Sequence, residues 1–346
     1  MILLAICAIA AGYQLFAILA CFEYRRQHLH GRRTLVSVLK PVRGADGNLE
    51  AALASHSKLE GDYELLCGVA SLDDPAVAVI RKFPKARVVV CSTVTPNAKV
   101  GLLIDLVKAA RHDIIIVNDA DICVPPDYLA RVSAPLADPR VGLVTCLYRA
   151  VGDTFPARFE ALGVATDFAP SARVARLVGV DEFAMGSTLA FRRADLEKIG
   201  GFESFSDYLA DDYQLGHRLH ALGLKCVLSD VMVETHLGGN WHDVWQHQVR
   251  WARTIRVSKF WGYLGLPVTF ATFWAIVCGN WRVGLALLAV RMLMAIVAGK
   301  KDALRMLFLI PLRDLFGVAV WTVALFGNTV VWRGRTLRLD RDGRIS

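Results

Sequence analysis

The amino-acid sequence predicts an α/β protein in which a mostly parallel sheet lies between apolar helices at the two ends of the chain. From Thr34 to about Val144, strand-like and helix-like segments alternate, which is the order that builds a parallel sheet with helices on both faces. Apolar residues gather in Met1–Cys21 and Phe260–Trp332, and hydrophobic residues make up 54% of the 346 residues. That share is above the usual one for a soluble enzyme. We therefore expect a globular domain tethered to a membrane.

The N-terminal segment has the length and composition of a membrane anchor. Residues 2–22 carry no charge and are enough to cross a bilayer as one helix. Because basic residues stay in the cytoplasm, the arginines and histidines that follow should place the central domain inside the cell, with the anchor (residues 1–24) in the inner membrane. A cleaved signal peptide, the competing interpretation, would have its positive charge before the apolar run. The basic residues are Arg25, Arg26, His28, His30, Arg32 and Arg33.

The central elements are predicted from the spacing of apolar residues and from the turn residues between them. The expected strands cover residues 35–39, 63–70, 86–90, 114–117, 141–148, 187–192 and 225–228. The expected helices cover residues 49–59, 75–83, 100–110, 194–200, 211–222 and 241–260, with a helix-rich excursion over 159–180. In sheets of this kind ligands bind beyond the carboxyl ends of the strands, so polar residues at those ends are the first candidates for a site.

The C-terminal apolar part, residues 260–332, is expected to lie in the membrane. Residues 260–281 and 283–299 are candidate spans separated by Arg282, and Lys300-Lys301 should return the chain to the cytoplasm. The central domain would then be anchored in the membrane at its C-terminal end as well as at its N-terminal end.

The last apolar stretch, residues 304–332, lies between basic clusters and is interrupted by Pro311, Arg313 and Asp314. Because basic residues on both sides should stay in the cytoplasm, a re-entrant or interfacial hairpin fits better than a single crossing. Residues 333–346 are then a basic cytoplasmic tail.

The charge and the cysteines set the remaining bounds. The net charge of +8 is better explained by basic clusters at an anionic membrane leaflet than by a nucleic-acid partner, and we expect none. The eight cysteines form no Cys-x-x-Cys pair and no zinc spacing with histidine. They are expected as buried small apolar residues in a reducing compartment.

Two acidic residues end the apolar run of residues 114–117. Asp119 and Asp121 follow it one residue apart, and carboxylates so placed can hold a divalent cation against a diphosphate. A plain capped turn is the alternative, because short Asp-x-Asp patterns are common. Lys40 and Asp73-Asp74 also lie at predicted strand ends, so the sequence predicts that they share one crevice with the Asp pair.

Four short patches then occur in order along the chain: Leu39-Lys40-Pro41-Val42-Arg43-Gly44, Asp119-Ala120-Asp121, Ala210-Asp211-Asp212-Tyr213 and His247-Gln248-Val249-Arg250-Trp251. From about Leu35 to Arg256 the chain resembles inverting, membrane-bound glycosyltransferases of the GT-A fold, most of all ceramide glucosyltransferases and related hopanoid-pathway enzymes. The resemblance implies a GT-A catalytic domain over residues 34–256, with an interfacial helix at 241–260. It also implies hexosyl transfer from a UDP-sugar, first UDP-glucose, to the hydroxyl of a membrane lipid, first ceramide, with Mg²⁺ or Mn²⁺.

The resemblance assigns roles to the acidic residues. Asp121 is implied as the metal ligand and Asp119 as a donor contact, since a bound cation offsets the charge of the leaving diphosphate. Asp212 matches the general base that takes the proton of the acceptor hydroxyl. Asp211 is either a helix cap or an acceptor-side residue, and the two acids can exchange these roles. Asp73 is implied as a further donor contact.

The basic and aromatic residues of the patches are implied to face the two substrates. Nucleotide-side contacts are implied for Lys40, Arg43 and Lys99, with an exposed lysine as the plain alternative at position 99. Arg250 would hold the pyrophosphate through a bidentate contact. His247 and Trp251 would wall the site where the lipid head group meets the sugar, although without the other patches their helix would be taken for an interfacial amphipathic helix.

Three positions leave the interpretation open. His247 stands where the family usually has Gln or Arg, and Ser71 stands where it usually has Asp near the nucleotide. The second departure puts the nucleotide corner in doubt and is compatible with an altered donor. Gly186, before a predicted strand, either brings a backbone N–H near the sugar or serves only a tight turn.

Other functions remain open at this stage. A hopanoid or diacylglycerol acceptor, with UDP-N-acetylglucosamine or another UDP-sugar as donor, is the near alternative. A processive polysaccharide synthase shares the fold and the Arg-Trp patch, but would have more spans and keep the Gln that His247 replaces. A degenerate lipid-binding protein without activity is suggested only by Ser71.

Overall fold

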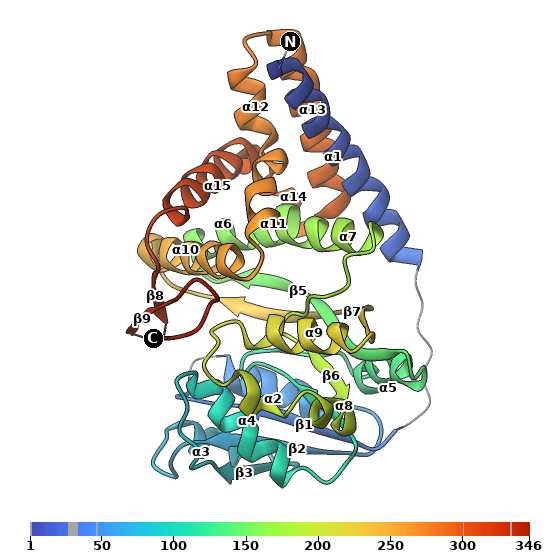
Figure 1. The fold of residues 1–346 in the computed structure, drawn as a ribbon, viewed down its shortest axis with the longest axis vertical. Helices are drawn as coiled ribbons and strands as arrows, with labels where there is room; N and C mark the ends of the chain where they lie inside the picture. Colours follow the sequence, from blue (N-terminus) through green and yellow to red (C-terminus); the bar gives the residue numbers. More distant parts are fainter. Residues whose placement is uncertain (1, 27–33, 46–47, 300, 333) are drawn as a thin grey trace.

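The computed structural model describes residues 2–26, 34–45, 48–299, 301–332 and 334–346. Figure 1 shows a sheet domain at one end of the molecule and a tapering group of apolar helices at the other, with the N-terminus at the tip of that group. Several basic residues on which the membrane orientation was predicted lie outside the described residues: His28, His30, Arg32, Arg33, Lys300 and Arg333. The orientation therefore stays a prediction.

The central sheet has seven strands in the order β3-β2-β1-β4-β6-β5-β7 within the described chain. Its strands are β1 (Val36–Pro41), β2 (Tyr63–Val69), β3 (Ala86–Val90), β4 (Ile114–Val117), β5 (Val141–Gly152), β6 (Leu189–Arg192) and β7 (Lys225–Leu237). All neighbouring pairs are parallel except those of β6, which runs antiparallel to β4 and to β5. The predicted α/β fold with a mostly parallel sheet is confirmed.

Strands β5 and β7 are longer than the sequence predicts. They pair as far as Gly152 and Leu237, whereas the expected strands end at residues 148 and 228. Two carboxylates within the extended part are ion-paired: Asp230 Oδ2 lies 2.9 Å from an Arg131 nitrogen, and Glu234 binds Arg149. Because these partners neutralise the acids, the strand continues through them.

Helices cover both faces of the sheet (Figure 1). They are α2 (Leu49–Ser57), α3 (Ala76–Ile80), α4 (Ala98–Ala109), α5 (Tyr128–Ser133), α8 (Arg193–Lys198) and α9 (Asp211–Ala221). One buried cluster joins Leu53 of α2 and Val132 of α5 to the sheet, and a second joins Leu103 of α4 and Leu215 of α9 to its other side. The two layers fix the strand ends at which the candidate site lies.

A helical excursion lies between the sheet and the apolar helices (Figure 1). It consists of α6 (Phe155–Gly163), a π-helical turn (Val164–Phe168) and α7 (Ala169–Leu177). Isolated π-helical turns are rare and frequently mark functional places. This one carries Asp167 into the contact with the apolar helices that is described below.

Three described helices are long and apolar enough to cross a membrane, by length and composition: Ile2–Arg25, Trp281–Ala298 and Leu307–Ala324. They correspond to α1 (Ile2–Arg26), α13 (Trp281–Ala298) and α15 (Ile310–Ala324) with the turn before it. A fourth pair, Phe260–Thr269 and Ala271–Val277, passes the same test together but is bent by 63°.

The C-terminal part differs from the prediction in two places: residues 260–277 are bent where a straight span was expected, and residues 310–324 are a straight helix where a break was expected. The bend falls within residues 260–277, where Pro267 opens a short 3-10 turn, and the sequence analysis expected a plain span there. Residues 310–324 form one continuous helix instead of a hairpin, because Pro311 lies in its first turn, where the missing N–H costs nothing. The stretch ends in a strand, β8 (Thr329–Trp332), so the expected hairpin is wrong, whereas the expected re-entrant or interfacial position of residues 304–332 stays a prediction.

The C-terminal residues pack against the sheet domain. Strand β8 pairs with β9 (Arg335–Arg338), and the N–H of Ile345 donates to the carbonyl of Asp207 over 2.7 Å. Arg344, expected at a lipid leaflet, forms an ion pair with Asp207 at 3.0 Å. The tail thus lies on the segment that leads into α9.

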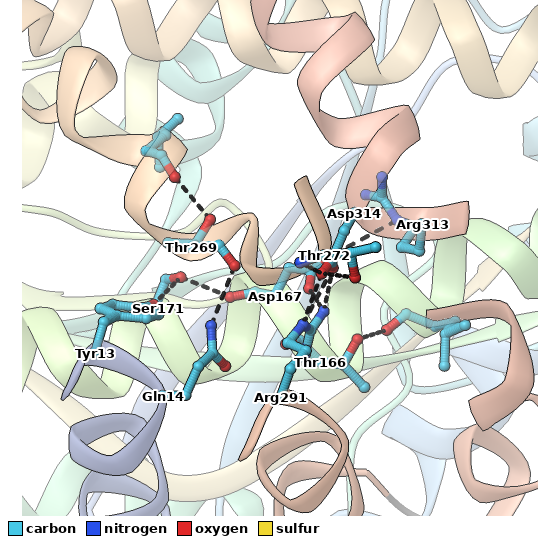
Figure 2. A network of polar contacts seen from close by, with 12 residues as sticks. Tyr13, Gln14, Thr166, Asp167, Ser171, Thr269, Thr272, Arg291, Arg313 and Asp314 are labelled. Atoms are coloured by element: carbon cyan, nitrogen blue, oxygen red, sulfur yellow. Dashed lines mark hydrogen bonds and ion pairs between the residues drawn. The ribbon is translucent and has the colours of Figure 1, made fainter. Parts of the chain in front are cut away.

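A buried ionic network joins the apolar helices to the excursion (Figure 2). Arg291 of α13 lies 2.8 Å from Asp314 of α15 and also pairs with Asp167 of the π-helical turn. Asp314 in turn accepts the N–H of Thr272, in α12 (Ala271–Val277), over 3.0 Å. Arg291 and Asp314 are each at most 2% exposed, so their opposite charges compensate each other where water has almost no access.

Candidate active site

The loop after β4 carries Asp119 and Asp121, and the side chain of Lys40 binds its backbone carbonyls. The Lys40 ammonium donates to the carbonyl of Asp119 over 2.9 Å and to that of Ile122 over 3.4 Å. Its side chain has no exposed surface, and burial lowers its pKa to about 8. Lys40 therefore shapes the loop in this arrangement, and the donor contact expected of it stays a prediction.

Asn118 fixes the other side of the same loop and was not singled out from the sequence. Its amide donates to the carbonyl of Ser187 over 2.7 Å and to the Tyr128 hydroxyl over 2.9 Å. The residue is fully buried. Its place directly between an apolar strand and Asp119 was the available signal, since a polar group there needs partners on neighbouring elements.

Lys99 joins the acidic pair to the start of α9. Its ammonium lies 2.9 Å from Oδ1 of Asp119 and 3.1 Å from Oδ2 of Asp211. Burial lowers the pKa of Lys99, but the carboxylates of Asp119, Asp211 and Asp212 outweigh it and raise the pKa above its usual range. The plain alternative of an exposed lysine is therefore wrong, and Lys99 stays charged within the site.

Asp212 is held by two backbone donors at the first turn of α9. Gly186 donates to Oδ2 over 2.8 Å, and Tyr213 donates to Oδ1 over 2.8 Å. Burial raises the pKa of Asp212 to about 6, with the nearby Asp211 acting in the same direction and Lys99 against it. A carboxylate with this pKa is ionised at neutral pH and still basic enough to take a proton.

Gly186 lies at the centre of these groups. A Cβ placed on it would come within 3.1 Å of Oδ2 of Asp119, and within 3.4 Å of both Oδ2 of Asp212 and the Lys99 ammonium. Asp119, Asp212 and Lys99 therefore surround one backbone position. The tight turn considered at the sequence level has a second purpose, because its N–H orients Asp212.

Asp121 lies deeper than Asp119 and is bound by Thr235 of β7, whose hydroxyl donates to Oδ2. Burial raises the pKa of Asp121, and the charge of Asp119 raises it further. Among the described residues no group of three or more His, Cys, Asp or Glu side chains is arranged for a metal ion. Two carboxylates still fit Mg²⁺ or Mn²⁺ beside a diphosphate, because such ions take their other ligands from phosphate and water.

Arg250 approaches the acidic group from α10 (Trp241–Ser258). Burial lowers its pKa, and the charges of Asp119, Glu160 and Asp212 act against that change. Within the described part of the chain, its guanidinium forms no hydrogen bond and no ion pair. A partly buried guanidinium in this state is well suited to an anionic ligand.

The aromatic residues of α10 pack against the helical excursion. The Trp251 ring lies 6.3 Å from that of Tyr148, 5.9 Å from that of Phe168 and 4.5 Å from that of His247. His247 contacts the buried carboxylate of Glu160 at 2.7 Å. The departure at position 247 thus has a partner of its own.

Gln248 connects α10 to α6 and α15. Its amide donates to Glu160 over 2.7 Å and its carbonyl accepts from Arg313 over 2.8 Å. Glu160 and Arg313 are both buried. Neither contact was visible in the sequence, since the three residues come from segments far apart in the chain.

The remaining predicted donor residues lie at the ends of β1 and β2. Arg43 and Asp73 are exposed there. The Ser71 hydroxyl donates to Asp73 over 3.2 Å, and the neighbouring Asp74 accepts the N–H of Gly44 over 3.0 Å. The corner at Ser71 thus retains two carboxylates, and its predicted part in donor binding stays a prediction.

Known proteins resemble the chain in sequence. It matches Glycosyl transferase family 21 over residues 2–345. It is 29% identical to ceramide glucosyltransferase 1 of Caenorhabditis elegans over 204 residues and 29% identical to ceramide glucosyltransferase 3 of that organism over 206. Each match covers 56% of this chain and 44% of the relative, so the chain aligns with less than half the length of these relatives.

A solved structure resembles it in fold. The mannosyltransferase PcManGT of Pyrobaculum calidifontis, determined with GDP-Man and Mn²⁺, superposes with a TM-score of 0.57 at 19% identity, covering 94% of this chain and 96% of the other. At this identity the likeness supports the GT-A type of fold and says nothing of the substrate.

Proposed function

The chain belongs to glycosyl transferase family 21, and we propose that it transfers a hexose from a UDP-sugar to the hydroxyl of a membrane lipid with inversion of configuration. UDP-glucose and ceramide are the first substrates to consider, because the two nematode relatives are named ceramide glucosyltransferases. The catalytic part comprises residues 34–256.

The observation that carries this proposal is the state of Asp212. The carboxylate is fixed by the N–H groups of Gly186 and Tyr213, and its raised pKa of about 6 suits a base at neutral pH. Asp212 accepts the proton of the acceptor hydroxyl as that oxygen attacks the anomeric carbon. Asp211 is engaged by Lys99 at 3.1 Å, so it is the positioning member of the pair.

The donor side is formed by Asp119, Lys99 and Arg250. Arg250, which has an unmatched charge among the described residues, binds the diphosphate, and Lys99 holds Asp119 toward the sugar. Asp121 together with Asp119 would hold Mg²⁺ or Mn²⁺, which when bound offsets the charge of the leaving UDP.

The acceptor side faces the apolar helices. Trp251 and Tyr148 pack together where α10 passes the excursion, and the three apolar helices rise from this level (Figure 1). A lipid whose chains lie among those helices can present its hydroxyl to Asp212 without leaving the bilayer. We place the protein in the inner membrane, with its catalytic domain in the cytoplasm.

The test is a transfer assay with the full chain in lipid nanodiscs. Labelled UDP-glucose, UDP-galactose and UDP-N-acetylglucosamine are each offered with ceramide, diacylglycerol or a hopanoid, with Mn²⁺ or with EDTA. We expect one β-linked glucose per ceramide and no product with EDTA. Transfer to a different lipid would correct the acceptor, several sugars per lipid would indicate a processive synthase, and no transfer from any donor, together with no UDP binding, would overturn the proposal.

A further inference from the structure

A cavity of about 600 Å³ lies on the side of β5 and β7 that faces the apolar helices. Its wall is made by the C-terminal half of β5, the middle of β7, helices α6 and α7, the π-helical turn between them, and residues at the ends of the candidate spans. Neither the acidic group around Gly186 nor Arg250 lines it. It is therefore separate from the candidate active site, although Tyr148 belongs to its wall and also packs on Trp251.

The lining of this cavity is strongly basic. Six arginines line it against one carboxylate, and they are Arg25, Arg131, Arg149, Arg158, Arg173 and Arg305. Arg131 and Arg149 are matched by Asp230 and Glu234. Arg158, Arg173 and Arg305 form no ion pair with any described residue, so the cavity has a surplus of positive charge.

Arg173 is a buried arginine in the wall of the cavity, held in place by its neighbours. It is 7% exposed, and its guanidinium lies 4.8 Å over the Tyr24 ring, with one nitrogen 3.2 Å from the Cys21 sulfur. Its Nε is buried and has no hydrogen-bond partner. Leaving a charged group buried without a counter-charge is costly, and an anionic oxygen in the cavity would offset the charge of this guanidinium.

The cavity also lies at one level of the apolar helices. Arg25 ends the candidate span Ile2–Arg25, Ala298 ends Trp281–Ala298, and Met306 directly precedes Leu307–Ala324, and all three line the cavity. Three spans that meet a cavity at their ends place it at the depth of lipid head groups. Apolar residues such as Leu162 and Val164 complete its wall, as the glycerol end of a lipid requires.

We propose that this cavity binds the phosphate head group of an anionic membrane phospholipid, with Arg173 as its central contact and Arg158 and Arg305 at its margin. The site is additional to the acceptor site, and its existence does not depend on the proposed transfer reaction. Because Tyr148 belongs to both walls, an occupied cavity supports the position of Trp251, so the lipid is also expected to raise activity.

The experiment measures thermal stability and lipid binding of the full chain in detergent. Phosphatidylglycerol, phosphatidylcholine and inorganic phosphate are added separately, and bound lipid is counted by native mass spectrometry. We expect phosphatidylglycerol alone to raise the melting temperature and to remain bound. The variant Arg173→Gln should weaken its binding at least about tenfold, which corresponds to roughly 1.4 kcal/mol.

Two further variants keep the test decisive. Arg282→Gln neutralises an arginine at the opposite end of α13 and should leave phosphatidylglycerol binding unchanged. Arg305→Gln changes an exposed residue at the margin, so it reports on the cavity even if Arg173→Gln does not fold, and it should weaken binding as well. Equal effects of the two lipids, or full binding by both cavity variants, would overturn the proposal, and equal protection by inorganic phosphate would overturn its lipid nature.

Discussion

The backbone N–H of Gly186 donates to Oδ2 of Asp212 over 2.8 Å. This bond ties the turn before β6 to the first turn of α9, and the same turn is bound on its other side by Asn118 through the carbonyl of Ser187. The proposed base is therefore oriented by backbone groups that cannot rotate away. One oxygen of its carboxylate faces the place where Asp119 and Lys99 also converge.

Replacing Asp212 by Asn should slow transfer strongly and remove one source of pH-dependent stability. General bases contribute about 10²- to 10⁴-fold to rate, so we expect a loss within that range in kcat. The pKa of Asp212 is raised in the folded state, which means that folding is opposed as the pH rises through the interval from about 4 to 6. The parent should therefore lose stability through that interval by an amount that the neutral Asn variant does not show, although the variant has only one acceptor oxygen for the N–H groups of Gly186 and Tyr213. The exposed residue Asp153 provides the control, since Asp153→Asn should change neither quantity, and unimpaired transfer by Asp212→Asn would remove Asp212 from the mechanism.

Replacing Lys99 by Met should shift the pH profile of activity. In the parent we expect kcat/KM to fall about tenfold per pH unit below pH 6, because only ionised Asp212 accepts a proton. Lys99 lowers the pKa of Asp212, so its removal should move this acid limb upward by at least about one pH unit. Lys99→Arg keeps the charge and should keep the limb near its original place. The pH dependence of initial rates measures both, and an unshifted limb in Lys99→Met would contradict the coupling.

Replacing Gly186 by Ala should lower activity more than stability. The added methyl group would lie 3.1 Å from Asp119, close enough to displace that carboxylate by a few tenths of an ångström, and would contact Asp212 and Lys99 at 3.4 Å. A misplacement of about 1 Å costs about 10²-fold in rate, so a shift of a few tenths of an ångström should cost roughly several-fold. A steady-state assay and a melting curve check this together. Gly238→Ala is the matched control, because a Cβ there meets nothing within 4 Å, and equal effects at the two positions would refute the interpretation.

Replacing Arg250 by Lys should weaken donor binding. Lysine keeps the charge but loses the bidentate geometry for a diphosphate, so we expect KM for the UDP-sugar to rise by roughly tenfold or more with a smaller change in the melting temperature. Arg253 lies on the same helix and instead donates to the carbonyls of Phe326 and Thr329. Arg253→Lys should therefore lower the melting temperature and leave KM close to that of the parent. The reverse pattern would show that Arg250 is structural.

The order of the central elements, and the ends of the strands, could be predicted from the sequence, because strands such as Ala86–Val90 and Ile114–Val117 are apolar runs with clear ends. The length of β7 could not. Its acidic residues Asp230 and Glu234 are unfavourable within a buried strand unless they are paired, and their partners Arg131 and Arg149 are known only from the structure. Such partners lie far away in the chain, so no local pattern contains them.

The same limit applies to the candidate site. The sequence places Lys40 and Lys99 near the Asp pair, but it does not distinguish the buried lysine that donates to backbone carbonyls from the one that pairs with carboxylates. That difference depends on the direction of each side chain from its element. The resemblance supplied the residue types, and the packing of Gly186 between three charged groups supplies their arrangement.

Replacing Asp314 by Leu should destabilise the contact between the apolar helices and the excursion (Figure 2). The change leaves Arg291, which is 1% exposed, with Asp167 as its remaining acidic partner and leaves the N–H of Thr272 without its acceptor. Breaking a buried ion pair on one side costs about 3–5 kcal/mol, so we expect a marked fall in the melting temperature of the detergent-purified chain. Asp314→Asn keeps an acceptor for Thr272 and should fall less. Replacing both partners, as in Arg291→Met with Asp314→Leu, removes the incompletely paired buried guanidinium, while Asp167 keeps Arg313 at 3.6 Å. The double variant should recover part of the loss, because the destabilisation comes from the guanidinium that has lost one of its two acidic partners and not from the missing bond. If the double variant melts lower than Asp314→Leu alone, the network stabilises the fold through its bonds and this account of it is wrong.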